Sequence, residues 1–273
     1  MTRIAVSNIG LPAFAHLDFL PRLMELGVTG LEVAPSRIWH DTWSGLSADD
    51  VSAYGQAVRD SGLKIIGLHS LFFDHPELGL FKGPDILMRT VEFLGHLSAV
   101  CRDLGGRTLV YGGGRRRDGV PMPDAFAACD VFLDAVLPVM ESHGTKLCFE
   151  PLGPNDTDFL NTAAQCAELA DRFNHPALGI QLDAKALVDN DELTPSSFAG
   201  VTGRLDHFHA NDPGLVVVGS TGIVDHAKIG AYLRDSGYVG WISSEQRMLN
   251  EQDPLADISA SVRAIHACYR GLS

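Results

Sequence analysis

The chain has 273 residues, a formal net charge of −13 and a hydrophobic content of 45%. The acidic balance argues against a general surface for nucleic acid or anionic membranes. No apolar stretch approaches the ~18 residues that a membrane-spanning helix needs. The five cysteines are odd in number and form no CxxC pair. A strand pattern begins at Ile4, which leaves no room for a signal peptide. These features predict a globular protein of a reduced, cytoplasmic compartment.

The N-terminal half repeats a unit of one strand and one helix. Short apolar runs predict strands at residues 4–7, 30–34, 64–69 and 108–111, with helical patterns near 13–26, 48–61, 84–104 and 123–143. Glycine takes the left-handed conformation that ends a helix without steric penalty. Such a glycine follows five predicted helices, just before the next strand: Gly27, Gly62, Gly105, Gly144 and Gly237.

The C-terminal half adds four more strands, and each ends in a polar residue. The runs at 146–150, 178–183, 204–209 and 241–245 end in Glu150, Asp183, His209 and Glu245. Strict alternation of eight strands with helices predicts an α/β fold, a single (β/α)8 TIM barrel over residues 1–273. A doubly wound open sheet is the alternative, but it rarely reaches eight strands without an interrupting domain. The glycine run at 112–114 also lacks the GxGxxG spacing of a dinucleotide site.

The four polar strand ends predict a metal site. In a barrel of parallel strands they meet at the C-terminal mouth, where such barrels keep their chemistry. Three carboxylates and an imidazole that converge on one point repel each other unless a cation lies among them. This donor set favours one divalent ion such as Mn, Mg or Co over a structural Zn, which prefers thiolates. Any one of the four alone would more simply be a strand-end residue that faces solvent.

The chain resembles the xylose isomerase-like TIM barrels, a superfamily that includes sugar phosphate isomerases and epimerases, ketose 3-epimerases, inosose dehydratases and apurinic endonucleases. The resemblance is most specific around Phe149-Glu150-Pro151, Gln181-Leu182-Asp183, His209-Ala-Asn-Asp212 and Ser244-Glu245. It implies that Glu150, Asp183, His209 and Glu245 correspond to the metal ligands of the ketose epimerases.

Two departures limit what the resemblance implies. The ketose epimerases carry a histidine where this chain has Ala186, and an arginine in a segment that here, at 212–219, contains none. Both groups help to hold substrate hydroxyls in those enzymes. The resemblance therefore implies the metal centre, but it does not imply 3-epimerisation of a free ketose. The apurinic endonucleases need further zinc-binding histidines, which Tyr111 and Ala186 replace. DNA repair is therefore not implied.

Two glutamates on one cation predict proton transfer. Glu150 and Glu245 would act as general base and general acid through a metal-stabilised enediolate, which makes the chain an isomerase or epimerase of a sugar, sugar phosphate or keto sugar. A lyase or dehydratase on a keto-cyclitol or 3-keto sugar, including loss of an aglycone, stays open. So does a non-catalytic sugar-binding accessory subunit.

Six further residues are candidates for substrate binding, each with a structural alternative. A histidine, an acid and a lysine near strand ends would contact substrate oxygens. In the alternative, the histidine is a residue of the barrel wall, the acid is a partner of a neighbouring strand, and the lysine lies in solvent. A tryptophan would pack on a sugar ring or in the core. Two arginines after the glycine run would bind a phosphate or carboxylate, or form a solvated patch. The candidates are His69, Glu32, Lys185, Trp39, Arg115 and Arg117. The expected partner is a small carbohydrate, and a homo-oligomer is left open.

Overall fold

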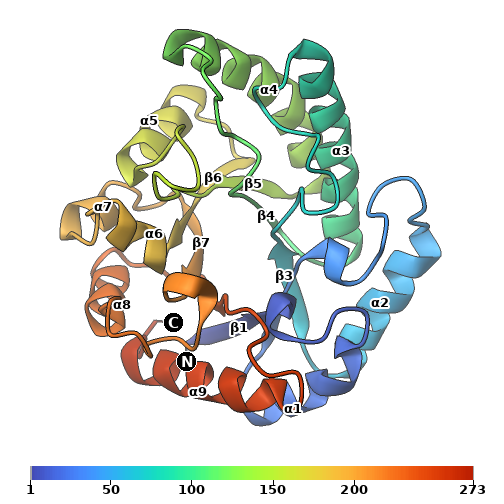
Figure 1. Ribbon diagram of the computed structural model, residues 1–273, viewed down its shortest axis with the longest axis vertical. Helices are drawn as coiled ribbons and strands as arrows, with labels where there is room; N and C mark the ends of the chain where they lie inside the picture. The colour runs from blue at the N-terminus through green and yellow to red at the C-terminus, as the bar shows by residue number, and fades with distance from the viewer. Residues whose placement is uncertain (1, 273) are drawn as a thin grey trace.

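Eight parallel strands close into a barrel in the computed structural model, which describes residues 2–272. Strand order follows the chain, and β8 pairs with β1 to close the ring (Figure 1). The strands are β1 Arg3–Ser7, β2 Gly30–Val33, β3 Lys64–Leu68, β4 Thr108–Tyr111, β5 Lys146–Phe149, β6 Leu178–Asp183, β7 Leu205–Ala210 and β8 Trp241–Ser244. The predicted α/β TIM barrel is confirmed.

The α-helices surround the ring of strands (Figure 1). They are α1 Leu20–Glu25, α2 Ala48–Asp60, α3 Pro84–Asp103, α4 Met122–His143, α5 Ala163–Phe173, α6 Ala184–Asp189, α7 Pro195–Ala199, α8 His226–Asp235 and α9 Pro254–Cys268. Short 3-10 turns are η1 Asn8–Gly10, η2 His16–Phe19, η3 Pro35–Arg37 and η4 Pro213–Leu215. None of the helices within residues 2–272 has both the length and the apolar composition needed to cross a membrane.

The first predicted helix, at 13–26, is wrong in its extent. Its first part is the 3-10 turn His16–Phe19, and the α-helix covers only Leu20–Glu25. Pro21 lacks a backbone N–H and is tolerated only in the first turn of an α-helix. The helix therefore starts at Leu20 and cannot extend back over residues 13–19.

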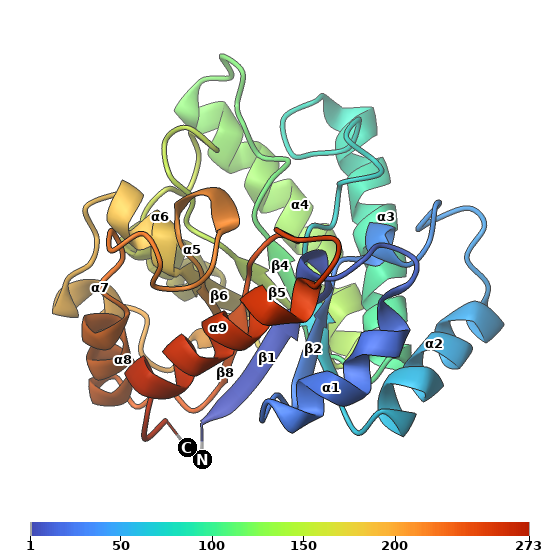
Figure 2. The same ribbon diagram turned by 60° about the horizontal axis from the view of Figure 1, so that its bottom comes forward.

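The predicted glycine helix ends are confirmed. The backbone φ angle is positive at Gly27 (83°), Gly62 (88°), Gly105 (84°), Gly144 (72°) and Gly237 (71°). Each glycine turns the chain from an outer helix into the next strand on the N-terminal side of the barrel. The longer loops, by contrast, gather where the strands end, on the upper side in Figure 2.

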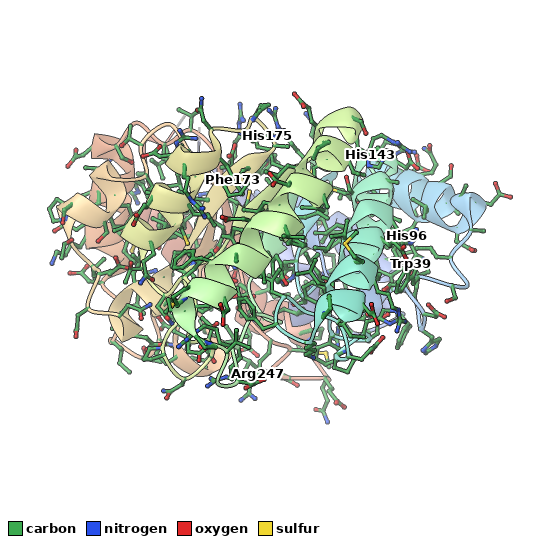
Figure 3. The ribbon with its side chains drawn as sticks, turned by 90° about the horizontal axis from the view of Figure 1, so that it is seen from above. Trp39, His96, His143, Phe173, His175 and Arg247 are labelled. Atoms are coloured by element: carbon green, nitrogen blue, oxygen red, sulfur yellow. The ribbon has the colours of Figure 1, made fainter. Side chains whose placement is uncertain are left out.

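Two kinds of core hold the barrel. Between sheet and helices the packing is apolar, and α3 and α4 lie side by side there (Figure 3), with Ser98 Oγ 2.8 Å from His143 Nδ1. Inside the ring, buried polar groups of strands that are not neighbours touch each other. Ser243 of β8 donates to Glu32 of β2 at 2.5 Å, for example. The interior of the barrel is therefore polar below its mouth.

Candidate metal centre and catalytic cavity

The four polar strand ends of the C-terminal half come together at the mouth of the barrel. Glu150 follows β5, Asp183 ends β6, His209 lies near the end of β7 and Glu245 follows β8. One ligating atom from each of the four lies within 4.8 Å of the others, and the four side chains are buried or nearly so. The barrel topology thus brings together four residues that span 95 positions of the chain.

His209 presents one ring nitrogen to the three carboxylates. Its Nδ1 is buried without a hydrogen-bond partner, 3.4 Å from Glu150 Oε1, 3.4 Å from Glu245 Oε2 and 3.8 Å from Asp183 Oδ2. Its Nε2 lies 3.1 Å from both carboxylate oxygens of Glu32. Because Glu32 accepts the Nε2 proton, the lone pair of the neutral ring falls on Nδ1. A histidine held in this way is arranged as a metal ligand.

The negative charges of the cluster raise the pKa values of two of its members, Asp183 and His209. Burial and the neighbouring charges of Glu150 and Glu245 raise the pKa of Asp183 to about 8. Burial opposes the charged forms of His209 and Glu245 too. Even so, Glu32 and Glu245 raise the pKa of His209 well above its usual value, while His209 and His69 lower the pKa of Glu245. Protons thus occupy the place that a bound cation would take.

The donor set fits a divalent ion. Three carboxylates and one imidazole supply oxygen and nitrogen but no sulfur. Burial raises the pKa of the thiols of Cys101, Cys129 and Cys166, so they stay protonated. Hard or borderline ions such as Mn and Mg match these donors, whereas a closed structural zinc site uses thiolates.

Glu32 supports His209 from below. It is fully buried, and it lies 2.9 Å from His207 Nε2 and 2.5 Å from the donor Ser243 Oγ in addition to its contact with His209. His207 and His209 also lower its pKa well below the usual range against the opposing effect of burial. Both oxygens accept from protein donors, His209 of β7 and Ser243 of β8, which are strands that do not neighbour β2 in the sheet. The contact of Glu32 with a substrate hydroxyl stays a prediction.

Asn211 is a site residue that the sequence did not predict. Its Nδ2 donates to Asp183 Oδ2 and, at 2.8 Å, to Glu245 Oε2. Its Oδ1 accepts from the backbone N–H of Lys185 at 3.0 Å. One amide therefore sets the spacing of two carboxylates from two different strands. The signal was present in the run His209-Ala-Asn-Asp212, two residues past the predicted ligand.

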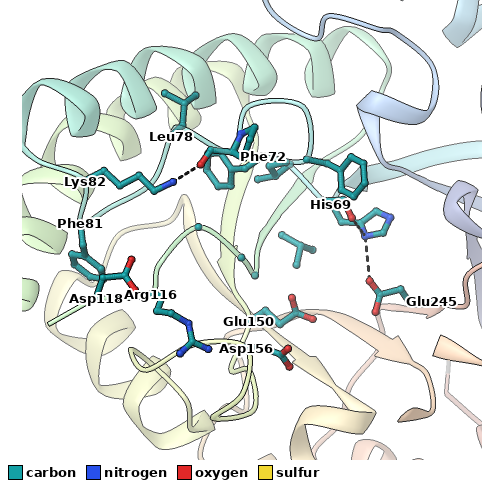
Figure 4. A pocket seen from close by; sticks show the side chains of 18 residues that line it. His69, Phe72, Leu78, Phe81, Lys82, Arg116, Asp118, Glu150, Asp156 and Glu245 are labelled. Carbon is teal, nitrogen blue, oxygen red and sulfur yellow. Dashed lines mark hydrogen bonds and ion pairs between the residues drawn. The ribbon is translucent and has the colours of Figure 1, made fainter. Parts of the chain in front are cut away.

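A cavity of about 510 Å³ opens beside the four residues. His69, Glu150 and Glu245 form its inner end, and Phe72 and Phe73 belong to its wall (Figure 4). His69 Nε2 lies 2.6 Å from Ser7 Oγ, and its Nδ1 lies 3.4 Å from Glu245 Oε1. His69 therefore contacts both the wall of the barrel and a carboxylate of the cluster.

The two arginines predicted to bind an anion are engaged within the protein. Arg115 is fully buried and donates to the carbonyl oxygens of Gly112, Phe159, Leu160 and Glu150. Arg117 donates to the carbonyl oxygens of Asp158 and Val120 and lies 3.4 Å from the Asp158 carboxylate. Neither is among the residues that line the cavity, and their guanidinium groups hold loops together. Their contact with an anion stays a prediction.

Lys185 and Trp39 are not among the residues that line the cavity, although Lys185 pairs with Asp156, which does. Lys185 Nζ is 2.7 Å from Asp189 and 3.1 Å from Asp156, which leaves it as a surface ion-pair residue. Trp39, labelled in Figure 3, packs edge-on against Tyr54 of α2 with ring centroids 5.6 Å apart. The substrate contacts of these two side chains stay predictions. The aromatic wall comes instead from the loop between β3 and α3.

Gly112 fixes the space around Glu150. A Cβ atom at position 112 would collide with Glu150 Oε2, whereas one at Gly113 would meet nothing within 4 Å. A glycine directly after β4 therefore leaves room for the Glu150 carboxylate in its place at the cluster, which a larger residue would displace. This explains why the first residue of the run at 112–114 is a glycine.

The protein is thus an eight-stranded parallel barrel whose mouth carries a cluster of carboxylates and histidine that could hold a metal ion. The family described as xylose isomerase-like TIM barrel matches residues 20–268. The chain belongs to this family. No curated protein matches the sequence significantly.

Solved structures share the fold along nearly the whole chain. An L-ribulose 3-epimerase has a TM-score of 0.80 at 20% identity, covering 98% of this chain and 95% of that one. A D-psicose 3-epimerase from Clostridium cellulolyticum H10 has a TM-score of 0.81 at 15% identity, covering 99% of each. The 3-keto-D-glucoside 4-epimerase YcjR from E. coli has a TM-score of 0.78 at 17% identity, covering 98% of this chain and 100% of that one.

Proposed function

We propose that this protein is a divalent-metal-dependent epimerase or isomerase of a small carbohydrate that carries a carbonyl group. The observation that carries the proposal is the unpartnered Nδ1 of His209, which faces three carboxylates at 3.4–3.8 Å. The epimerase activities of similar barrels agree with it. Glu150, Asp183, His209 and Glu245 would hold the ion.

Glu150 and Glu245 are the groups placed to move protons. They come from β5 and β8, and both line the cavity (Figure 4). A bound divalent ion would polarise the substrate carbonyl and stabilise the negative charge that develops when the neighbouring proton leaves. One glutamate removes the proton beside the carbonyl, and the other returns a proton. Return to the opposite face of the same carbon is epimerisation, and return to the neighbouring carbon is isomerisation.

The other two members of the cluster have supporting roles. Asp183 is held by Asn211 and by the backbone N–H of Ala186 at 2.7 Å, and so is fixed as a ligand. His209 is fixed by Glu32. His69 contacts Glu245 and the cavity, which suits it to hold a substrate oxygen next to the acid-base group.

Solvent deuterium exchange tests the proposal. The protein is loaded with Mn²⁺ and incubated in D₂O with a panel of ketoses, 3-keto sugars and keto sugar acids, followed by NMR and mass spectrometry. We expect deuterium at the carbon beside the carbonyl and a product of the same composition. The Asp183→Asn variant, which keeps the side-chain shape but removes a ligand charge, is the matched control.

The other outcomes are distinct. A product lighter by water or by an aglycone would identify elimination and replace the proposal with a lyase. Binding of a sugar without any exchange would indicate a binding subunit. Exchange that persists in the Asp183→Asn protein after chelation would remove the metal from the reaction.

A further inference from the structure

We propose that the outer part of the cavity binds an anionic group, a carboxylate or a phosphate, at the end of the substrate remote from the metal. This inference rests on the proposed function because it names the class of carbohydrate that the same cavity takes. The binding groups are Arg116, Lys82 and the backbone N–H groups of Gly113 and Gly114, the part of the glycine run that lies beyond Glu150. All of them line the cavity (Figure 4).

Arg116 differs from the two arginines beside it. Whereas Arg115 and Arg117 are held by protein carbonyls and by Asp158, Arg116 is exposed and lies on the cavity wall. Its guanidinium makes one hydrogen bond within residues 2–272, to the carbonyl of Asn155. A guanidinium has five N–H donors, so four remain for a ligand.

Lys82 brings a second positive charge from a different loop. It lies between β3 and α3, is exposed, and lines the same cavity as Arg116. Its Nζ donates to the carbonyl of Pro76, which holds the side chain in place and leaves two donors. Neither Lys82 nor Arg116 forms a salt bridge within the described chain.

The glycine run adds neutral donors between these charges. In the part of the chain that the structure describes, the N–H groups of Gly112, Gly113 and Gly114 donate to no protein acceptor. Gly114 has a φ of +79°, and a Cβ at Gly113 would meet only open space. Successive free N–H groups at a left-handed turn form a concavity that binds anions. A ligand can therefore reach the backbone of this loop.

Two acids on the same wall set the balance of charge. Asp156 shares Lys185 with Asp189, at 3.1 and 2.7 Å, so its charge is only partly matched, while Asp118 is exposed at the rim. Arg116 and Lys82 offset the charges of Asp118 and Asp156 at the outer end, in a chain whose net charge is −13. Phe72, Leu78 and Phe81 also line the cavity, with Phe81 beside Lys82 and Asp118 at the outer end (Figure 4), and would pack against the carbon chain of the substrate.

Calorimetry on matched sugars tests the anion site. Binding of D-fructose, D-fructose 6-phosphate and 5-keto-D-gluconate to the Mn²⁺-loaded protein separates a neutral, a phosphate and a carboxylate ligand. We expect at least one charged sugar to bind roughly 10- to 100-fold more tightly than fructose. Arg116→Gln and Lys82→Gln should each lower the affinity for the charged sugar about tenfold, with a much smaller effect on the affinity for fructose. Arg102→Gln, at the opposite end of α3, is the control for loss of one surface charge.

Equal binding of all three sugars would overturn the inference. A preference for charged sugars that survives in both variants would also overturn it, because the anion would then lie on the metal. The same holds for a preference that Arg102→Gln reduces as much as the two variants do. The deuterium experiment separates this result from the proposed function. Exchange without charge preference contradicts only the anion site, and charge preference without exchange contradicts only the catalytic proposal.

Discussion

The carboxylate of Glu32 lies 3.1 Å from His209 Nε2 through each of its two oxygens, and this contact decides which nitrogen of the ring faces the metal cluster. Glu32 comes from β2 and His209 from β7, on different sides of the barrel. The carboxylate is itself held by His207 and Ser243. A buried polar layer therefore orients His209, the proposed metal ligand, above it.

Removing the Glu32 charge should weaken metal binding without removing a ligand. In Glu32→Gln the amide no longer fixes the Nε2–H tautomer, and the loss of such a partner costs roughly 10- to 100-fold in metal affinity. His209→Ala should lose the metal more completely. Titration of the metal-free proteins with Mn²⁺ measures both. The exposed Glu25→Gln variant should bind like the unaltered chain, and unchanged affinity in Glu32→Gln would leave His209 oriented by other contacts.

Glu150→Gln and Glu245→Gln should lower turnover more than substrate affinity. A general acid or base contributes about 10²- to 10⁴-fold to the rate. Metal content has to be measured in each variant, because both residues are also proposed ligands. Glu251→Gln, in the same loop as Glu245, is the control. A metal-loaded Glu245→Gln protein with normal turnover would take that residue out of the proton transfer.

The sequence predicted the part of this site that depends on chain-wide repetition. Strand ends that recur once in each strand-helix unit must meet at one mouth when eight units close. For this reason the clustering of Glu150, Asp183, His209 and Glu245 could be anticipated. The glycines that end the helices follow from local backbone sterics, and they too were predicted correctly.

What could not be predicted depends on the direction of single side chains. Three successive arginines give no sign of which one is buried, and the structure buries Arg115, one of the two that were predicted to bind an anion. Glu32 lies one residue before the end of β2, and only the closed barrel shows that its carboxylate lies against His209 Nε2. Asn211 follows its strand by one residue, and only the closed barrel shows which carboxylates it reaches.

Gly112→Ala should damage the site while the barrel stays folded. The added methyl would collide with Glu150 Oε2 and displace that carboxylate, and a misplacement of about 1 Å can cost ~10²-fold in rate. Gly113→Ala is a matched control, since a Cβ there meets nothing within 4 Å. Turnover and the circular dichroism spectrum are measured for both. Equal activities would show that Glu150 moves freely.

Arg115→Met should destabilise the fold. The change removes the donor of the buried carbonyl oxygens of Leu160 and Glu150, and leaves that of Phe159 with only a 3.5 Å bond from Thr157 Oγ1. Unsatisfied buried groups cost about 1–3 kcal/mol each before relaxation. We expect a loss of about 3 kcal/mol or more in the free energy of unfolding by urea. Arg116→Met, next in the chain but exposed, should change stability by less than about 0.5 kcal/mol. Similar values for the two would contradict the distinction drawn between them.

Metal removal should matter more at pH 8 than at pH 6. Burial, Glu150 and Glu245 raise the pKa of Asp183 from 3.8 to about 8, so the metal-free protein holds a proton there that the unfolded chain lacks between these values. This contribution to stability is present at low pH and is lost as the pH rises through about 8. A bound cation replaces the proton, and metal affinity should therefore increase with pH until about 8 and then level off.

The measurement is the difference in melting temperature with Mn²⁺ and with chelator, taken from pH 6 to pH 8.5. The difference should widen over this range as the metal-free protein loses the Asp183 proton. Asp183→Asn carries a neutral side chain at every pH, so its metal-free form should not show the same loss of stability. Calorimetry in buffers of different ionisation enthalpy should also detect proton release on metal binding near pH 7. A difference in melting temperature that stays constant with pH would mean that Asp183 is already ionised without the metal.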